Sequence, residues 1–338
     1  MAPINKAASL PSARAHPLTI ETTEYPTAGN GEVVVKVAAT AVNPMDWYIQ
    51  IMGEKLFSWL KYPYIGGSDV AGTVTEVGPN VNNVKVGDRV LGLAAGFAPR
   101  AGGFQNYVVL EAGIVAPIPA DLDFTEASVI PLGISTAACG LYQKNFLALD
   151  YPSVTPKPNG KTILIWAGSS SVGTNAIQLA AASGYEVFTT ASSKNFDYCK
   201  SIGASRVFDY HSETITQDLL EAFKGKQCAG GYAIQLGSEK IVFEVVAKSQ
   251  GAKFVACAMQ PNDVPEGISA KMVFGSTLKD NEVGPIIFQQ YLPAALAQKK
   301  WQPLPKPLVA GHGLEKVQDA IDKGKSGEVS AQKLVITL

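Results

Sequence analysis

Short runs of β-branched residues alternate with Gly, Pro and Asn between residues 31 and 122. The clearest runs are residues 32–37, 72–78, 87–90 and 107–110. Short apolar runs separated by turn residues are typical of strands in an irregular all-β unit. The first third of the chain is therefore predicted to be β-rich.

The pattern changes at Lys161, where apolar runs of strand length begin to alternate with helical stretches. The predicted strands are residues 162–167, 186–191, 206–208, 232–236 and 253–259. The predicted helices are residues 172–183, 196–202, 214–223 and 240–247. This alternation predicts a parallel sheet with helices on both of its faces.

The last part of the chain does not continue this alternation. It contains a predicted helix over residues 285–300, a Pro-rich piece at 302–307, a helix over 314–324 and a strand over 333–337. A single C-terminal strand needs a partner, and the β-rich first part offers one. We therefore expect an α/β protein whose doubly wound parallel sheet, residues 127–287, is inserted into a β-rich domain of residues 1–126 and 288–338.

Composition and charge exclude several classes of protein. The 338 residues include 28 basic and 29 acidic ones, for a net charge of −1, so neither nucleic acid nor an anionic membrane is expected as partner. Four scattered cysteines contain no C-x-x-C pair, which argues against a disulfide scaffold or a structural zinc site. The N-terminal residues lack the apolar segment of a signal peptide. We expect a cytoplasmic protein.

A turn of small residues follows the first strand of the alternating part. Gly168 and Gly173 take the first and third glycine places of G-x-G-x-x-G, and Ser170 takes the second. Small residues let backbone N–H groups at a helix start approach a pyrophosphate. The predicted cofactor-binding residues of this turn are Gly168, Ser169, Ser170, Ser171, Val172 and Gly173.

The end of the next strand bears on which dinucleotide binds. An acidic residue there would bind the ribose hydroxyls of NAD, but this chain has Ser192, Ser193 and Lys194. Hydroxyls and a lysine suit a 2′-phosphate, and Tyr210 could add a donor. NADP(H) is therefore the predicted cofactor, although Lys194 would also fit as a solvated lysine at a helix start.

Several motifs along the chain resemble those of the medium-chain dehydrogenase/reductase superfamily. They are Asn43-Pro44-Met45-Asp46-Trp47-Tyr48, Gly66-Gly67-Ser68-Asp69-Val70-Ala71-Gly72, Gly87-Asp88-Arg89-Val90, Gly102-Gly103-Phe104 and the turn at 167–173. The resemblance covers nearly the whole chain. It implies a GroES-like β domain that holds both termini, with a Rossmann domain inserted between them.

Zinc enzymes of this superfamily bind a catalytic metal through Cys, His and Cys. The matching positions here are Asn43, Ser68 and Leu132, which cannot make the site that zinc prefers. No metal is therefore predicted. The sequence is similar to the zinc-free branch, which contains quinone oxidoreductases and enoyl reductases, and among these to the fungal trans-acting enoyl reductases.

Without a metal, the substrate must already be electrophilic, as is a C=C bond conjugated to a carbonyl. The predicted catalytic residues are Asn43, Tyr48 and Thr136. The resemblance implies that Tyr48 lies near the nicotinamide, where it would donate a proton or wall the pocket, and that Thr136 faces the carboxamide. In lovastatin-type enoyl reductases a lysine takes the place of Tyr48. Asp46 is expected to orient its loop by local hydrogen bonds rather than to act as an acid, because a carboxyl needs a strongly raised pKa to hold a proton at neutral pH.

Further cofactor contacts are implied at Cys257, Phe274 and Lys333. Apolar residues within 47–60 would line a substrate pocket or form a plain core or lid helix. We predict an NADPH-dependent, zinc-independent reductase of an enone, enoyl thioester or quinone. Two alternatives stay open: a non-catalytic dinucleotide-binding protein, and an enzyme of a non-redox biosynthetic step. Besides the small-molecule substrate, the candidate partners are a second copy of the chain, in a homodimer, and a synthase.

Overall fold

The chain begins in a β-rich unit, leaves it for a second unit and then returns to the first. A computed structural model describes residues 3–338. The β-rich unit contains the residues up to Leu132, with Gly284–Ala297 and Pro303–Leu338. The second, the Rossmann unit, contains Gly133–Val283 and Gln298–Gln302. The sequence predicts boundaries after residues 126 and 287, whereas the units change at Leu132 and Val283.

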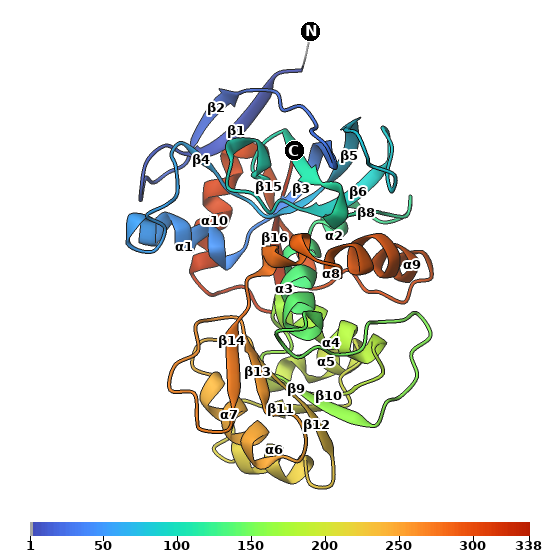
Figure 1. The fold of residues 1–338 in the computed structure, drawn as a ribbon. Helices are drawn as coiled ribbons and strands as arrows, with labels where there is room; N and C mark the ends of the chain where they lie inside the picture. Colours follow the sequence, from blue (N-terminus) through green and yellow to red (C-terminus); the bar gives the residue numbers. More distant parts are fainter. Residues whose placement is uncertain (1–2) are drawn as a thin grey trace. The chain divides into compact units, whose positions relative to one another are not determined.

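Two sheets form the β-rich unit (Figure 1). The larger consists of β3 (Glu32–Ala41), β5 (Asp69–Val77), β6 (Arg89–Leu93), β7 (Tyr107–Glu111), β8 (Val115–Pro117), β15 (Lys306–His312) and β16 (Gln332–Thr337). Its strand order is β15-β16-β3-β5-β6-β8, with β7 also paired to β3. The smaller consists of β1 (Asn5–Leu10), β2 (Thr19–Thr23) and β4 (Tyr64–Ile65), in the order β2-β1-β4.

The valine-rich run of β3 forms the centre of the larger sheet. Val33, Val35 and Val37 pack in one core with Val70 and Val74 of β5. Val34 is buried as well, so β3 is covered on both faces, which explains why its sequence is apolar without alternation. The core of this unit therefore fixes β3 and β5, whose ends lie next to the candidate site.

The C-terminal strand joins the β-rich unit, as predicted. β16 pairs with β3 in antiparallel register, with Ile336 opposite Thr40 (Figure 1). The strand β15, which pairs with β16 in parallel, was not predicted because Pro305 and Pro307 indicated a loop. A proline is tolerated here because β15 lies at the edge of the sheet.

Among residues 3–338, the α-helices that lie wholly within the β-rich unit are α1 (Pro44–Met52), α2 (Phe124–Ala127), α9 (Leu292–Ala297) and α10 (Val317–Lys325). Of these, α2, α9 and α10 contact strands of the larger sheet. The single helix predicted for residues 285–300 is instead α8 (Val283–Pro285), a π-helical piece (Ile286–Tyr291) and α9. α10 packs on β16 through an apolar cluster that includes Val317, Ile321, Leu334 and Ile336.

A six-stranded, fully parallel sheet forms the Rossmann unit (Figure 1). Its strands are β9 (Lys161–Ile165), β10 (Glu186–Ala191), β11 (Arg206–Asp209), β12 (Gln227–Ala233), β13 (Phe254–Cys257) and β14 (Ser269–Met272). They have the order β11-β10-β9-β12-β13-β14, which is the 3-2-1-4-5-6 order of dinucleotide-binding sheets. The predicted α/β fold class is confirmed.

The helices of this unit are α3 (Pro131–Tyr142), which begins in the β-rich unit, α4 (Ser171–Ala182), α5 (Phe196–Ser201), α6 (Ile215–Ala222) and α7 (Glu239–Lys248). One stretch, Phe124–Tyr142, is long and apolar enough to cross a membrane, but 72% of it is buried inside the structure. Burial of this extent is also found in the core helices of globular proteins. The apolar residues 162–185 form β9, a turn and α4, as predicted.

Candidate functional site

The turn between β9 and α4 has a cap made from its own serine. Ser170 is the N-cap of α4, and its Oγ accepts the N–H of Gly173 at 3.1 Å. The same hydroxyl donates to the carbonyl of Ala167 at 2.7 Å. An N-cap serine satisfies one of the N–H donors at the start of the helix that have no partner within the helix.

The two glycines of this turn are required by close packing. A Cβ at Gly173 would collide with the carbonyl oxygen of Ala167, and a Cβ at Gly168 would lie 2.8 Å from Ile177 Cδ1. The backbone therefore passes closely from β9 into α4, so no side chain covers it at these two positions. This cradle fits a pyrophosphate, which binds to backbone N–H groups at a helix N-terminus.

Beyond β10 lie the residues that were predicted to select the cofactor. Ser193 and Lys194 are exposed, and Lys194 makes no ion pair with any residue between 3 and 338. Asn195, which sequence reasoning missed, donates from its Nδ2 to Ser169 Oγ and to Ser192 Oγ, both at 3.3 Å. The turn and the end of β10 are thus brought together by one amide.

Tyr210 follows β11 and is exposed. Its ring lies 4.0 Å from the ring of His211, and His211 is paired with Asp209 through Nδ1 at 3.0 Å. Asp209, the acidic residue at the end of β11, is therefore bonded to His211. The Tyr210 hydroxyl makes no hydrogen bond with any residue between 3 and 338, so it could donate to a ligand.

Three other predicted residues of the Rossmann unit lie in different surroundings. Cys257 ends β13 and is buried, and burial raises the pKa of its thiol to about 12, which disfavours the thiolate form that a nucleophile needs. Phe274 is exposed after β14. Thr136 lies in α3, where its carbonyl accepts the Tyr232 hydroxyl at 2.7 Å. Cofactor contacts by these residues stay predictions.

In the β-rich unit, a buried carboxylate connects the ends of three segments. Asp69 begins β5 and is 0% exposed. Its Oδ2 lies 2.6 Å from Lys333 Nζ of β16 and accepts the Asn43 side-chain amide at 2.6 Å. Its Oδ1 accepts the N–H of Leu132 at 2.6 Å. Lys333, only 4% exposed, also donates to the carbonyl of Val129 at 3.2 Å.

This network includes Asn43 and Leu132, two of the three positions that the resemblance matches to metal ligands of zinc enzymes. The Asn43 side chain and the Leu132 backbone both bind Asp69, and the third position holds the hydroxyl of Ser68. An amide, a hydroxyl and an aliphatic side chain do not make the Cys/His set that zinc prefers. Within residues 3–338, no group of three His, Cys, Asp or Glu side chains could hold a metal ion. The residues present do not fit a zinc ion.

Asp46 is a second buried carboxylate near this network. Its Oδ2 accepts the N–H of Asn43 at 2.7 Å, and its Oδ1 accepts the N–H of Gly67 at 3.3 Å. Burial raises the pKa of this carboxyl to about 7, against the opposing effect of the two N–H donors. The expected role in orienting its loop agrees with these two bonds. The raised pKa is also what the alternative role, that of an acid, would require.

Tyr48 lies on the opposite side of α1 from Asp46. The helix buries Asp46 and Gln50 while it exposes Met45, Tyr48 and Ile51, three apolar residues spaced by three. Further on, Trp59 is 52% exposed and its ring lies 4.5 Å from that of Phe97. Such an exposed apolar face is typical of a surface that binds a ligand or a partner.

Comparisons with known proteins identify the family of this chain. Residues 29–120 match the alcohol dehydrogenase GroES-like domain, and residues 171–249 match the zinc-binding dehydrogenase domain. A dehydrogenase named azaJ from Aspergillus niger is 48% identical over 347 residues, which cover 99% of this chain and 99% of that relative. The chain belongs to the medium-chain dehydrogenase/reductase superfamily.

Two further matches agree with membership of the medium-chain dehydrogenase/reductase superfamily. A trans-enoyl reductase named himH from Aspergillus japonicus is 39% identical, over 99% of this chain and 98% of that relative. The crystal structure of an alcohol dehydrogenase superfamily protein from Novosphingobium aromaticivorans has a TM-score of 0.80 and 26% identity, with 99% of each chain covered. The protein is thus an oxidoreductase of a dinucleotide-binding family that acts on small molecules.

Sequence reasoning named Asn43 and Lys333 but missed Asp69, which holds both of them. Asp69 is separated from Lys333 by most of the chain, and only the pairing of β16 to β3 and of β3 to β5 brings them together. The signal that could have found it is the acidic residue inside an otherwise apolar strand, since a buried charge needs a partner.

Proposed function

We propose that this protein is an NADPH-dependent, zinc-independent reductase of an activated C=C bond, in an enone or an enoyl thioester, or of a quinone. The observation that carries the proposal is the Asp69 network. Two positions that would supply metal ligands are bound to Asp69, whose charge Lys333 neutralises at 2.6 Å. A substrate that is already polarised by conjugation needs no such ligand set.

The Rossmann unit supports the cofactor part of the proposal. Gly168, Ser170 and Gly173 form the cradle that would hold the pyrophosphate, with Ser169, Ser171 and Val172 around it. Ser192, Ser193 and Lys194 would bind the 2′-phosphate, because hydroxyls and an ammonium group donate to an anion that an aspartate would repel. Tyr210 would add a hydroxyl. When bound, the reduced nicotinamide supplies the hydride.

The β-rich unit would supply the proton and bind the substrate. Hydride addition at the β carbon leaves negative charge on the enolate oxygen, and a proton must reach the α carbon. Tyr48, whose side of α1 is exposed, is the proposed donor. Asn43 gives its amide to Asp69 and to the carbonyl of Ala41, so its proposed part is to fix the start of α1. Thr136 and Lys333 are retained as proposed cofactor contacts.

The apolar side of α1 favours an apolar substrate. Met45, Tyr48 and Ile51 are exposed beside one another at helical spacing, and the Trp59–Phe97 pair extends the apolar surface of this unit. All four cysteines are free and buried, which supports a reducing compartment, and we propose the cytoplasm. We also propose that the protein forms a homodimer or binds a synthase. The mass of the protein in solution, alone and with a candidate synthase, would test this.

Transfer of a labelled hydride tests this function. The protein is incubated with a linear 2-enone and NADPH that carries deuterium at the reactive carbon of the nicotinamide, and the product is examined by NMR. We expect one deuterium at the former β carbon and a solvent proton at the α carbon. Cofactor binding without turnover of any enone, thioester or quinone would favour a non-catalytic protein, and product formed without NADPH would favour a non-redox reaction.

Tyr48→Phe tests the proton donor. Loss of the hydroxyl should lower kcat by about a hundredfold if Tyr48 donates the proton, within the usual range for a general acid. Tyr151→Phe, which removes the hydroxyl of an exposed tyrosine in the Rossmann unit, is the matched control and should retain kcat. An unchanged kcat in Tyr48→Phe would leave this tyrosine as a wall of the pocket.

A further inference from the structure

Asp46 sits where two segments of the β-rich unit meet. It is the third residue of α1 and is 9% exposed, whereas Tyr48, two residues later, is exposed on the other side of the helix. One carboxylate oxygen accepts the N–H of Asn43 at the start of α1, and the other accepts the N–H of Gly67 in the turn before β5. The two segments are therefore joined through a single side chain.

We propose that Asp46 is a positioning residue for the reduction, whose ionised carboxylate holds the start of α1 against the turn at residues 66–68 and whose protonation releases that turn. This inference rests on the proposed function, because the positions that it fixes are those of Asn43 and Tyr48. Asp46 itself is directed away from the exposed side of α1 and does not act on the substrate.

Gly67 donates its N–H to the Asp46 carboxylate from a left-handed backbone conformation. Its φ is +85°, a left-handed value that favours glycine, and a Cβ there would lie 2.6 Å from the Phe104 ring. Its carbonyl accepts the N–H of Gly103 at 2.7 Å, so the turn is also bonded on its far side. The Gly67 N–H is thus aimed at Asp46 by the backbone.

The two buried carboxylates of this region have different partners. Asp69 has the ammonium group of Lys333 at 2.6 Å, but Asp46 forms no ion pair with any residue between 3 and 338. The charged groups that face Asp46 are Asp69 and Lys333, and the titratable hydroxyl of Tyr64 lies across the cavity. Asp46 is therefore a buried carboxylate without a cation at ion-pair distance among the described residues.

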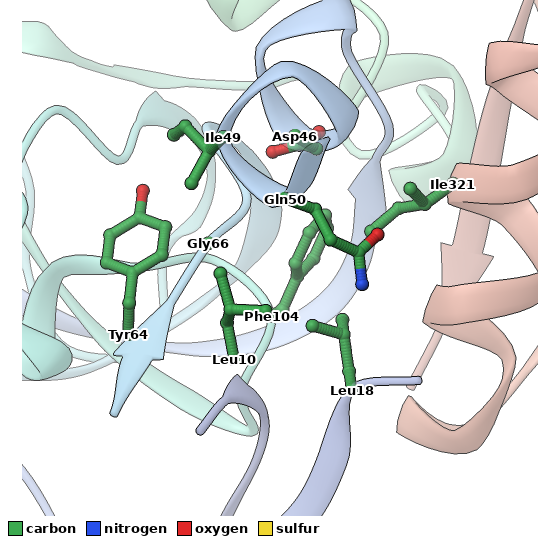
Figure 2. Close-up of a pocket in the computed structure, with 9 residues that line it drawn as sticks. All are labelled: Leu10, Leu18, Asp46, Ile49, Gln50, Tyr64, Gly66, Phe104 and Ile321. Carbon is green, nitrogen blue, oxygen red and sulfur yellow. The ribbon is translucent and has the colours of Figure 1, made fainter. Parts of the chain in front are cut away.

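A small cavity lies beside the Asp46 side chain (Figure 2). Its volume is about 20 Å³, which is room for about one water molecule. Its walls are apolar apart from Asp46, Gln50 and Tyr64, and consist otherwise of Leu10, Leu18, Ile49, Gly66, Phe104 and Ile321. A protonated Asp46 would direct its O–H to a water molecule in this cavity, which would then accept the hydrogen bond.

Protonation would break the weaker of the two bonds. A neutral carboxyl keeps one good acceptor oxygen. Oδ2, which accepts the N–H of Asn43 at 2.7 Å, would remain that acceptor, and Oδ1, which lies 3.3 Å from the N of Gly67, would take the proton. Because burial raises the pKa of Asp46 to about 7, this change falls in the neutral range. Turnover should therefore decrease as the pH falls below about 7.

The pH dependence of kcat and of the KM for NADPH tests the proposal. In the wild type, kcat should fall about tenfold per pH unit below the pKa, while the KM for NADPH changes less than about twofold. Asp46→Asn should have a kcat lowered at least about tenfold at pH 8, since small misplacements of reacting groups are costly, and should lose the pH dependence.

Asp88→Asn is the matched control. Asp88 accepts the N–H of Lys85, three residues earlier, at 2.9 Å, which is the same local bond that Asp46 makes to Asn43, but it lies at the surface. This variant should keep both the kcat and the pH dependence of the wild type. An Asp46→Asn variant with the kcat and pH profile of the wild type would overturn the proposal.

An infrared titration of the protein without substrate separates this proposal from the proposed function. A protonated-carboxyl band that appears below about pH 7 in the wild type and in Asp88→Asn, but not in Asp46→Asn, is expected. Absence of such a band from the wild type would overturn the proposal even if Asp46→Asn failed to fold. A titrating band in a protein that reduces no enone or quinone would contradict only the proposed reaction.

Discussion

In the β-rich unit the polar side chains around Asp69 are buried and bonded to one another, whereas in the Rossmann unit Ser193, Lys194 and Tyr210, which were predicted to bind a phosphate, are exposed. Asp69 and Lys333 are satisfied within the protein, and Lys194 has no partner among residues 3–338. Buried polar groups of the first kind determine structure, because each is costly to leave alone. Exposed donors of the second kind cost little and are suited to a ligand.

Removal of Lys333 should have the largest effect on stability. Lys333→Met leaves the carboxylate of Asp69 buried without its cation, and we expect a loss of about 3–5 kcal/mol in the free energy of unfolding. Lys226→Met breaks a pair with Glu186 that is partly exposed, so it should cost about 1 kcal/mol or less. Urea denaturation measures both. Equal losses in the two variants would show that the Asp69 network has no special weight.

The change in the free energy of unfolding with pH tests Asp46, the buried carboxylate whose pKa is raised. The pKa of Asp46 rises from 3.8 in the unfolded chain to about 7 in the folded protein. Between these values only the unfolded chain has lost the proton, so stability falls as the pH rises, by at most about 4 kcal/mol for about three pH units at 1.4 kcal/mol each.

Asp46→Asn has no proton to lose at this position and should lack that decrease. Denaturant unfolding of the wild type, Asp46→Asn and Asp88→Asn at about pH 5 and pH 8 measures it, with the last variant as the control. If Asp46→Asn loses as much stability as the wild type between the two pH values, another group is responsible.

In the Rossmann unit the expected effect is on the cofactor. Lys194→Ala should raise the KM for NADPH about tenfold, or about 1.4 kcal/mol, because one charge-assisted hydrogen bond is lost. The KM for NADH should not change, since that cofactor has no 2′-phosphate. Lys200→Ala, another exposed lysine on the following helix, is the control. The same factor for both cofactors would remove Lys194 from the phosphate site.

The smallest expected effects are those of two helix caps, one in each unit. Ser170→Ala removes the cap of α4, and Asp123→Ala removes the cap of α2, where Asp123 accepts the N–H of Thr125 at 2.8 Å. Each should cost about 1 kcal/mol in unfolding. Only Ser170→Ala should also weaken NADPH binding, measured by fluorescence titration. Weaker binding in both variants would point to a general loss of folding.

The contrast between the units also explains what could be predicted from the sequence. The turn at 168–173 and the strand Glu186–Ala191 have local signals, and both lie where the sequence placed them. The strand Ser269–Met272 was missed because it is short and mostly exposed, with no apolar alternation. The strand Lys306–His312 was missed because its prolines are typical of loops.

Within the candidate site, the residue types could be predicted but their contacts could not. Asn43 and Tyr48 stand out in their motif, whereas the contact of Asp69 with Lys333 depends on the register of three strands. The charge state of Asp46 depends on burial by α10, β4 and the segment around Phe104, which come from distant parts of the sequence. Long-range packing of this kind leaves no local pattern.

Turnover after removal of metal tests the central claim most directly. The protein is dialysed against a strong chelator, its zinc content is measured by elemental analysis, and its rate with NADPH and a 2-enone is compared with that of the untreated sample. We predict an unchanged kcat in a sample that contains far less than one zinc per chain, and a clear preference for NADPH over NADH. A rate that disappears with the zinc and returns when zinc is added would contradict the claim.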